Sequence, residues 1–384
     1  MEIVKTGNFP PHILVNSSKK IHGWYPGKRE CTSERILLNP YIGCDVECFF
    51  CYALSYPGRF QSFRKERVIF VYENFVENLK NQIEKLNVAF CGYLSPVSEP
   101  FQTLEKIYHL STKTIELFVS LNIPIEFITK EVIPDNVVEL IEGKKHCFGQ
   151  VSILTPEEKL RKKLMKKGAS TEDLFRNIEK LAKRGIFTVC RIDPVIPFIT
   201  DNKEKLKMVI KKAVDSGASH IIASVMDIPS TIYDDVLTEI RKRFGKSVEN
   251  KIRKLYVEKI GSWYNAKIDY RRDIFSFLRN VCDKENVSFA LCMEYEKKDG
   301  KIVGLNREFM SSENCEGINI PVYFRKGNKF FPGCDCNGNC LNCKESKCGI
   351  EELAQGKEKE GNYKGWKYSD YLRWSKIIGE NRLF

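Results

Sequence analysis

The chain has 384 residues, of which 42% are hydrophobic and 29% are charged. These fractions are ordinary for a soluble globular protein, so the chain is expected to fold by itself. The N-terminus has no apolar stretch after a basic start, and nowhere do about eighteen residues in a row remain apolar, which argues against secretion and against a membrane-spanning helix. We therefore expect a cytoplasmic protein.

A formal net charge of +12 at pH 7 suits a nucleic-acid partner, because cations that neutralise phosphates give affinity without reading the base sequence. Two basic runs, residues 160–167 and 240–246, fall in amphipathic helical stretches. A solvated helix face is the simpler interpretation of such runs. Charge alone leaves both interpretations open.

From residue 36 onward, short β-branched runs alternate with longer stretches of helical periodicity, which predicts repeated βα units and a parallel sheet. The predicted strands cover residues 36–41, 88–94, 125–129, 149–154, 188–193 and 220–225. The predicted helices between them cover residues 71–86, 104–121, 135–141, 171–184 and 203–216. Six such units predict an α/β fold, a partial (β/α)6 barrel of the TIM type.

We expect four parts along the chain: an N-terminal extension (1–35), the partial barrel (36–245), a helical and strand segment that completes the barrel (246–310), and a small cysteine-rich, metal-binding C-terminal region (311–384). In barrels of this kind, functional groups gather on the loops that follow the C-terminal ends of the strands. The loops after the predicted strands are therefore the places to look for a site.

Fifteen cysteines in a chain of this length without a secretion signal favour metal ligation or catalysis over a disulfide framework. Cys44, Cys48 and Cys51 follow the first predicted strand with the spacing C-x3-C-x2-C. Three such thiolates can hold three irons of a [4Fe-4S] cluster and leave the fourth iron open to a small-molecule ligand. The alternative is a structural zinc site, for which Cys31 could be recruited from upstream as the fourth ligand.

This spacing, with the aromatic Phe50 before the last cysteine, resembles the signature of the radical S-adenosylmethionine (SAM) superfamily. The resemblance implies that the amino and carboxylate groups of SAM chelate the open iron. It also implies that the reduced cluster cleaves SAM to a 5'-deoxyadenosyl radical, with electrons from a flavodoxin- or ferredoxin-like donor.

Further strings after successive strands resemble the spore photoproduct lyase branch of this superfamily, over roughly residues 36–230. These strings lie at residues 39–53, 98–102, 128–130, 151–155 and 191–197. By that resemblance Glu99 and Lys130 contact the amino-acid moiety of SAM. Ser152 contacts polar groups of its ribose or amino acid, and Arg191 contacts its carboxylate or ribose. A structural ion pair at the barrel mouth is the alternative for each.

The chain departs from that branch after the second strand, where it has Glu99-Pro-Phe-Gln in place of the Asp-Pro-Tyr-Gln of related proteins. The spacing around the family's hydrogen-donor cysteine is therefore not reproduced. Cys91, near the end of the second predicted strand, could return a hydrogen atom to a substrate radical. A small buried hydrophobe is the alternative interpretation of this cysteine, and photoproduct repair does not follow from the resemblance.

The C-terminal region contains a second group of cysteines, with Cys315 upstream of it. The members of this group are Cys334, Cys336, Cys340, Cys343 and Cys348. Three of them, beginning at Cys336, repeat the C-x3-C-x2-C spacing. Four of these thiolates predict a second metal site, either an auxiliary [4Fe-4S] cluster or a structural zinc.

For the substrate, the resemblance and the positive charge favour a nucleobase in DNA or RNA, in repair or modification. A peptide or protein is the second candidate, because auxiliary clusters are frequent in peptide-modifying relatives. The third is a non-catalytic iron-sulfur protein that binds nucleic acid or senses redox state. Residues 361–374 interleave aromatic and basic side chains, which predicts either a surface that stacks on bases or a helix that packs against the barrel.

Overall fold

The computed structural model describes all residues except 1–2, 6, 29–33, 334–335, 358–361 and 382–384. Its centre is a seven-stranded sheet in the order β15-β11-β10-β9-β8-β7-β3, and the neighbouring strands are parallel throughout. The strands are β3 (Ile36–Leu38), β7 (Gly92–Leu94), β8 (Ile125–Thr129), β9 (Phe148–Ser152), β10 (Phe187–Val195), β11 (His220–Val225) and β15 (Ser288–Leu291). The predicted α/β partial barrel is confirmed, with β15 as one strand more than the six units expected.

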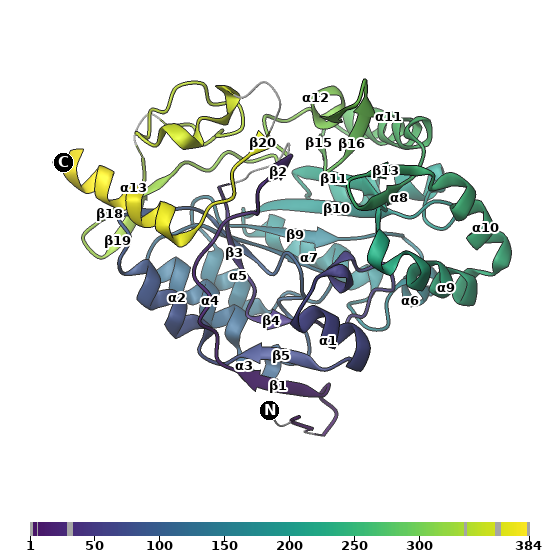
Figure 1. Cartoon of the computed structure of the whole chain (residues 1–384), viewed down its shortest axis with the longest axis horizontal. Helices are drawn as coiled ribbons and strands as arrows, with labels where there is room; N and C mark the ends of the chain where they lie inside the picture. The colour runs from purple at the N-terminus through teal and green to yellow at the C-terminus, as the bar shows by residue number, and fades with distance from the viewer. Residues whose placement is uncertain (1–2, 6, 29–33, 334–335, 358–361, 382–384) are drawn as a thin grey trace.

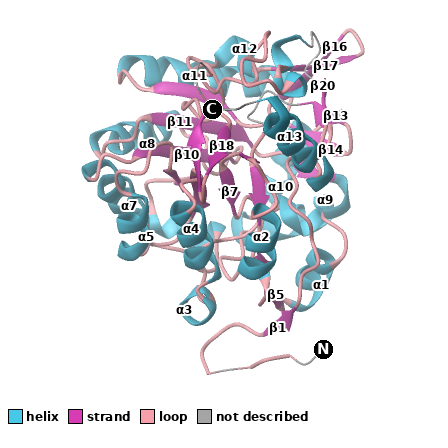
Figure 2. Ribbon diagram, turned by 90° about the vertical axis from the view of Figure 1, so that its left-hand side faces the viewer, coloured by secondary structure: helices cyan, strands magenta, loops and turns pink. Residues whose placement is uncertain are grey.

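Helices cover the outer face of this curved sheet, as Figures 1 and 2 show. They are α2 (Phe75–Ile83), α4 (Leu110–Ser120), α5 (Asp135–Ile141), α7 (Thr171–Lys183), α8 (Lys203–Asp215) and α11 (Ile268–Lys284). Helix α7 illustrates how the sequence specifies them. The Ser170 hydroxyl accepts a hydrogen bond from the Asp173 N–H and caps the first turn. Leu174, Ile178 and Leu181 then recur at helical spacing, and all three are buried against the sheet.

Several predicted elements differ from the structure, and two of them are divided. The expected strand 88–94 is divided into β6 (Val88–Ala89) and β7, because β6 pairs with a C-terminal strand while β7 pairs with β3 and β8. The expected helix 104–121 is broken at His109, which has a φ of 52°, into α3 (Glu105–Tyr108) and α4. The four-part division of the chain stays a prediction.

A small sheet of β1 (His12–Val15), β5 (Ile69–Tyr72) and β4 (Tyr41–Ile42) supports the start of the cysteine loop. Strand β5 pairs in parallel with β1 and antiparallel with β4. The predicted helix 71–86 therefore begins later than expected, because its first residues belong to β5. This sheet fixes the chain just before Cys44.

The C-terminal region packs against the barrel. The hairpin of β18 (Tyr323–Lys326) and β19 (Lys329–Pro332) extends β6, and α13 (Tyr368–Asn381) follows it. Tyr371 and Trp374 are buried against Phe90, with ring centroids 5.6 Å apart in both pairs. These aromatic residues form a packing helix and are not available to stack on bases.

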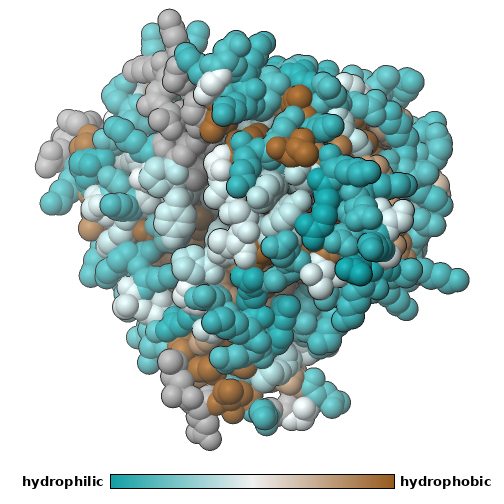
Figure 3. All heavy atoms as spheres, turned by 45° about the vertical axis from the view of Figure 1, so that its right-hand side comes forward, coloured by the Kyte–Doolittle hydropathy of each residue, from teal (hydrophilic) through white to brown (hydrophobic). Residues whose placement is uncertain are grey.

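The surface in Figure 3 is mainly hydrophilic, and its apolar patches are small and scattered. Among the described helices, none combines the length and the apolar character needed to cross a membrane.

A buried ionic cluster joins three distant segments at the N-terminal end of the barrel strands. Arg35 is 1% exposed, and its guanidinium lies 2.8 Å from Glu34, 3.0 Å from Glu126 and 2.5 Å from Glu316. Burial, and then the neighbouring Glu316 carboxylate, raise the pKa of Glu126 well above its usual range. Arg35 therefore holds the start of β3, the start of β8 and the C-terminal region together.

The substitution Arg35→Met should lower the free energy of unfolding by about 3–5 kcal/mol, because it leaves buried carboxylates without their cation. Urea unfolding of the metal-free protein measures this loss. The control is Arg184→Met, which breaks an ion pair with Glu142 whose side chains are 47% and 41% exposed and should cost about 1 kcal/mol or less. Equal losses in the two variants would contradict the assignment.

Candidate functional site

The cysteine loop follows β3 and β4 at the C-terminal end of the barrel, as the sequence predicts. Cys48 forms an isolated β-bridge with Met165, and the N–H of Cys51 donates to the carbonyl of Cys48 at 3.2 Å. Cys51 is the residue before the short 3-10 helix η1 (Tyr52–Ser55), and its carbonyl accepts a hydrogen bond from the Leu54 N–H at 3.2 Å. The loop is thus held both by its own turn and by a neighbouring segment of the barrel.

The three thiols of this loop are free, partly buried neighbours. Burial raises the pKa of Cys44 well above its usual range, and the nearby Cys51 and Cys48 add to the shift. Burial likewise raises the pKa of Cys48 to about 12. Three thiolates here therefore need a cationic group to compensate them.

A [4Fe-4S] cluster fits this donor set of three close thiols. Among the described residues, no three possible ligand side chains already surround a single point, so the thiols would turn inward to bind one. Cys31, which the zinc alternative would recruit as a fourth ligand, lies outside the described residues.

Glu99 lies on the turn after β7 and is 4% exposed. Its carboxylate accepts hydrogen bonds from the Thr129 hydroxyl at 2.5 Å, the Lys130 N–H at 2.8 Å and the Phe101 N–H at 3.1 Å. Burial raises its pKa to about 7, against the lowering effect of these donors. The Gln102 side chain on the same turn donates to the carbonyl of Gly43 at 3.3 Å, which places this turn against the cysteine loop.

Lys130 follows β8 and is half-buried. Its ammonium lowers the pKa values of Cys48 and Cys51 against the larger effect of burial. The structure therefore brings Lys130, Glu99 and the cysteine loop together, although they are far apart in the sequence.

Arg191 on β10 is buried and already has several partners. Its guanidinium donates to the Gln150 side chain at 2.8 Å, to Asp193 at 3.2 Å and to the sulfur of Cys292 at 2.9 Å. Asp193 in turn accepts a hydrogen bond from Ser224. Arg191 is thus a member of a fixed polar network across β9, β10, β11 and the end of β15.

Ser152 is the register partner of Arg191 on the neighbouring strand β9. Its hydroxyl is completely buried and has no hydrogen-bond partner among the described residues. It is one of several buried side-chain polar atoms for which the described residues provide no hydrogen-bond partner, and its position at the end of β9 suits a site that receives a ligand.

Cys292 is a member of the site that the sequence analysis missed. It directly follows β15, at the C-terminal end of the barrel. Burial raises its pKa to about 12. In the sequence, the residues around Cys292 form an apolar run that gives no sign of a functional site. Only the position of Cys292 at the end of a strand could have indicated it.

The predicted position of Cys91 was wrong. The thiol lies before β7 and not near the end of that strand, because the expected strand is divided there. Cys91 is 1% exposed, and its electrostatic neighbours include Arg35, Glu126 and Glu316. It therefore lies at the N-terminal end of the strands, and its position favours a buried hydrophobe over a hydrogen donor.

The C-terminal cysteines gather at that same N-terminal end, with Cys334 outside the described residues. Burial is the largest cause of the raised pKa of Cys340, and the charges of Glu34, Cys348 and Cys336 raise it further. Cys348 and Cys336 also raise the pKa of Cys343. These four free thiols thus lie in one region, next to the residues that precede β3, although no three possible ligand side chains among the described residues already surround a single point. Figure 1 shows this yellow region well away from α1 (Arg59–Glu66), the helix that follows the cysteine loop.

Comparison with known proteins gives a family match, two relatives and a solved structure of similar fold. Residues 38–213 match the radical SAM superfamily. The chain is 27% identical over 371 residues to a protein of Pseudomonas phage M6 named radical SAM Nalpha-GlyT isomerase, a match that covers 90% of this chain and 76% of the relative. It is also 25% identical over 167 residues to an uncharacterized protein of Methanocaldococcus jannaschii. This match covers 44% of this chain and 62% of that relative.

Among solved structures, a mutant of spore photoproduct lyase has a similar fold, with a TM-score of 0.53 and 12% identity over 71% of this chain and 78% of that one. The family match confirms the expected radical SAM domain and the expected class, an enzyme. The non-catalytic hypothesis is therefore wrong.

Gly43 precedes the first cysteine and determines how closely the loop packs. Its φ is +85°, and a Cβ there would lie 2.4 Å from the ring of Phe63. We expect Gly43→Ala to lower the free energy of unfolding by about 2–4 kcal/mol, from left-handed strain and overpacking together, and to lower the iron bound after anaerobic reconstitution. Urea unfolding and iron analysis measure the two effects.

The matched control is Gly58→Ala. Its φ is +71°, but a Cβ there meets nothing within 4 Å, so it reports the backbone strain alone, about 1–2 kcal/mol. If both variants lost the same stability and the same iron, the contact with Phe63 would not shape the cluster loop.

Proposed function

We propose that this chain, a radical SAM enzyme, abstracts a hydrogen atom from a nucleobase in DNA or RNA and so repairs or modifies it. The observation that carries the chemistry is the group of three free thiols beside Glu99 and Lys130 at the C-terminal end of the barrel. Cys44, Cys48 and Cys51 would hold the cluster. When bound, the cluster offers an open iron to SAM and supplies the electron that cleaves it.

The protein's own groups would position SAM. Glu99 would accept hydrogen bonds from the ammonium group, and Lys130 would pair with the carboxylate. Ser152 has the unused hydroxyl that a ribose or amino-acid group could satisfy. Arg191 is already bonded to Gln150, Asp193 and Cys292, so we expect it mainly to hold this end of the sheet in shape.

A nucleobase is favoured as the substrate by the charge of +12, which suits a phosphate backbone. The fold of spore photoproduct lyase is consistent with that choice. The name of the phage relative makes an isomerisation the first reaction to test. A reducing cytoplasm with a flavodoxin- or ferredoxin-like donor would supply the electrons.

A peptide substrate remains the second candidate. It is the substrate class that an auxiliary cluster in the C-terminal region would favour. A cluster there would not reach the substrate, because Cys340 lies near Glu34 and Arg35, which precede β3, at the end of the barrel away from the cysteine loop.

We also propose a second metal site formed by Cys336, Cys340, Cys343 and Cys348. The ends of barrel strands opposite the active site usually serve stability, so this metal would be structural. Either zinc or a [4Fe-4S] cluster suits four thiolates.

The purified protein, reconstituted anaerobically with iron and sulfide, should form 5'-deoxyadenosine from SAM and dithionite. Single-stranded DNA or RNA should stimulate this reaction and should contain an altered nucleoside after digestion, as measured by mass spectrometry. The variant Cys48→Ala, which lacks one proposed cluster ligand, should abolish both products. Stimulation by a peptide library and not by nucleic acid would instead assign the enzyme to peptides.

The second site should bind metal independently of the first. A variant with alanine at Cys44, Cys48 and Cys51 should retain the C-terminal metal, whereas Cys340→Ser should lose it, melt at a lower temperature and still bind iron in the cysteine loop. Elemental analysis for zinc and iron, with thermal unfolding, measures these changes. An unchanged metal content in Cys340→Ser would rule this site out.

A further inference from the structure

The basic run at residues 161–167 lies against the cysteine loop. The run completes α6 (Glu158–Leu164), after which Met165 forms a bridge with Cys48. The N–H of Lys166 donates to the carbonyl of Val46 at 2.9 Å. The simpler interpretation of this run as a solvated helix face is therefore incomplete, because its end is part of the support of the loop.

Four exposed lysines of this run form what we call the lysine rim. They are Lys162, Lys163, Lys166 and Lys167. Met165, between them, is 1% exposed, so the backbone is anchored while the lysine side chains reach solvent. The rim is thus a fixed basic border beside the cysteine loop.

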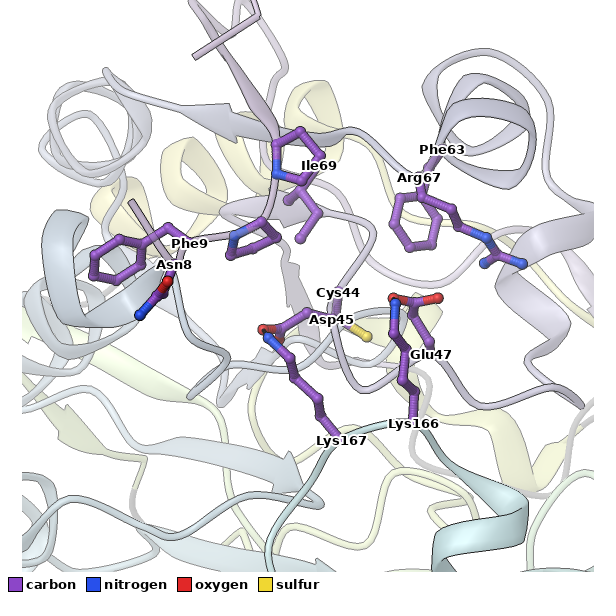
Figure 4. Close-up of a pocket in the computed structure, with 12 residues that line it drawn as sticks. Asn8, Phe9, Cys44, Asp45, Glu47, Phe63, Arg67, Ile69, Lys166 and Lys167 are labelled. Carbon is purple, nitrogen blue, oxygen red and sulfur yellow. Dashed lines mark hydrogen bonds and ion pairs between the residues drawn. The ribbon is translucent and has the colours of Figure 1, made fainter. Parts of the chain in front are cut away.

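A cavity of about 290 Å³ opens between this rim and the N-terminal segment. Figure 4 shows the sulfur of Cys44 in its centre, with Lys166 and Lys167 on one side and Phe63 and Arg67 on the other. Of the three cysteines of this loop, Cys44 lines the cavity. A cluster bound to Cys44 would therefore come close to solvent here.

The cavity lining is slightly basic, because three cations, Lys166, Lys167 and Arg67, stand against two carboxylates. Lys166 lies 2.8 Å from Glu47, with side chains 65% and 21% exposed, and an ion pair this exposed contributes little and exchanges partners readily. Lys167 lies 2.9 Å from Asp45, whose side chain is only 3% exposed, so this pair is held more firmly. Lys162 and Lys163 lie outside the cavity lining and add exposed positive charge along the rim.

The cavity also offers an apolar contact. Phe9, Pro10 and Pro11 form its wall on the N-terminal side. A small apolar patch within a charged rim is the usual composition of a transient protein interface. This surface therefore suits a protein partner better than a phosphate backbone alone.

We propose that the lysine rim and the cavity beside Cys44 dock an acidic one-electron donor protein. The proposal rests on the proposed function, since only a redox cluster at Cys44 needs a reductant. Electron transfer weakens steeply with distance, so the donor has to approach the cluster closely, and opposite charges steer it to this surface. The donor loses one electron and the cluster gains it, while no bond forms or breaks.

The test uses the double variant Lys163→Glu/Lys166→Glu and a photoreduced acidic flavodoxin as the probe. Stopped-flow bleaching of the cluster absorbance by flavodoxin at low salt should slow about tenfold or more, and its salt dependence should flatten. Oxidised flavodoxin should also bind the metal-free variant more weakly in a calorimetric titration. Dithionite, which needs no docking, should reduce the variant at the wild-type rate.

The matched control is Lys297→Glu/Lys298→Glu, which changes two exposed lysines on strand β16 (Tyr295–Lys298), outside the lining of the cavity, and should leave the flavodoxin rate unchanged. An equal slowing in this control would overturn the proposal. A second result would also overturn it: the rim variant keeps the wild-type flavodoxin rate but binds single-stranded DNA more weakly. That result would assign the rim to nucleic acid.

If the first variant fails to fold, Lys162→Glu/Lys163→Glu on α6 tests the same expectation one turn earlier. If dithionite does not drive SAM cleavage in the wild-type protein, the proposed function is wrong. This result does not bear on docking, because flavodoxin binding to the metal-free protein is measured separately.

Discussion

The buried charge of Arg35 is the constraint on which the arrangement of this chain depends. An arginine that is 1% exposed is tolerated only if carboxylates surround it, because an unpaired charge in the interior is very costly. Glu34, Glu126 and Glu316 supply these carboxylates. Two of them come from segments far along the chain, so satisfying one guanidinium brings the C-terminal region onto the end of the barrel.

The opposite end of the same strands collects the groups for chemistry. Parallel strands place their C-terminal ends at one edge, and the connecting loops there are free to carry function. The cysteine loop, Glu99 and Lys130 meet at this edge, with Ser152 and Cys292 at the ends of their own strands. The chain thus keeps its two groups of cysteines apart, one at the edge for reaction and one beside the Arg35 cluster.

Much of this arrangement could be predicted from the sequence. The alternation of strands and helices predicted the parallel barrel, because each amphipathic helix has to cover a buried strand. The spacing of Cys44, Cys48 and Cys51 predicted a compact thiol loop, since residues three or four apart on one turn must stay close. The position of Glu99 after a strand predicted that it would face the same edge.

Other features could not be predicted because they arise from pairing between distant segments. The predicted strand around Cys91 is divided because β6 pairs with β18, and no local pattern indicates this pairing. Cys292 bonds to Arg191, which lies 101 residues earlier in the chain. The lysine rim lies beside the cysteine loop because Met165 is buried against Cys48.

The sequence by itself determined the local chemistry, namely which short segments become strands or helices and which loop carries three thiols, because propensity and spacing act over a few residues. Only the tertiary structure decided which end of the barrel each cysteine occupies, which hydroxyl stays without a partner and which lysines border the loop. Those outcomes depend on burial and on contacts between residues that are distant along the chain, and burial exists only once the whole chain has folded.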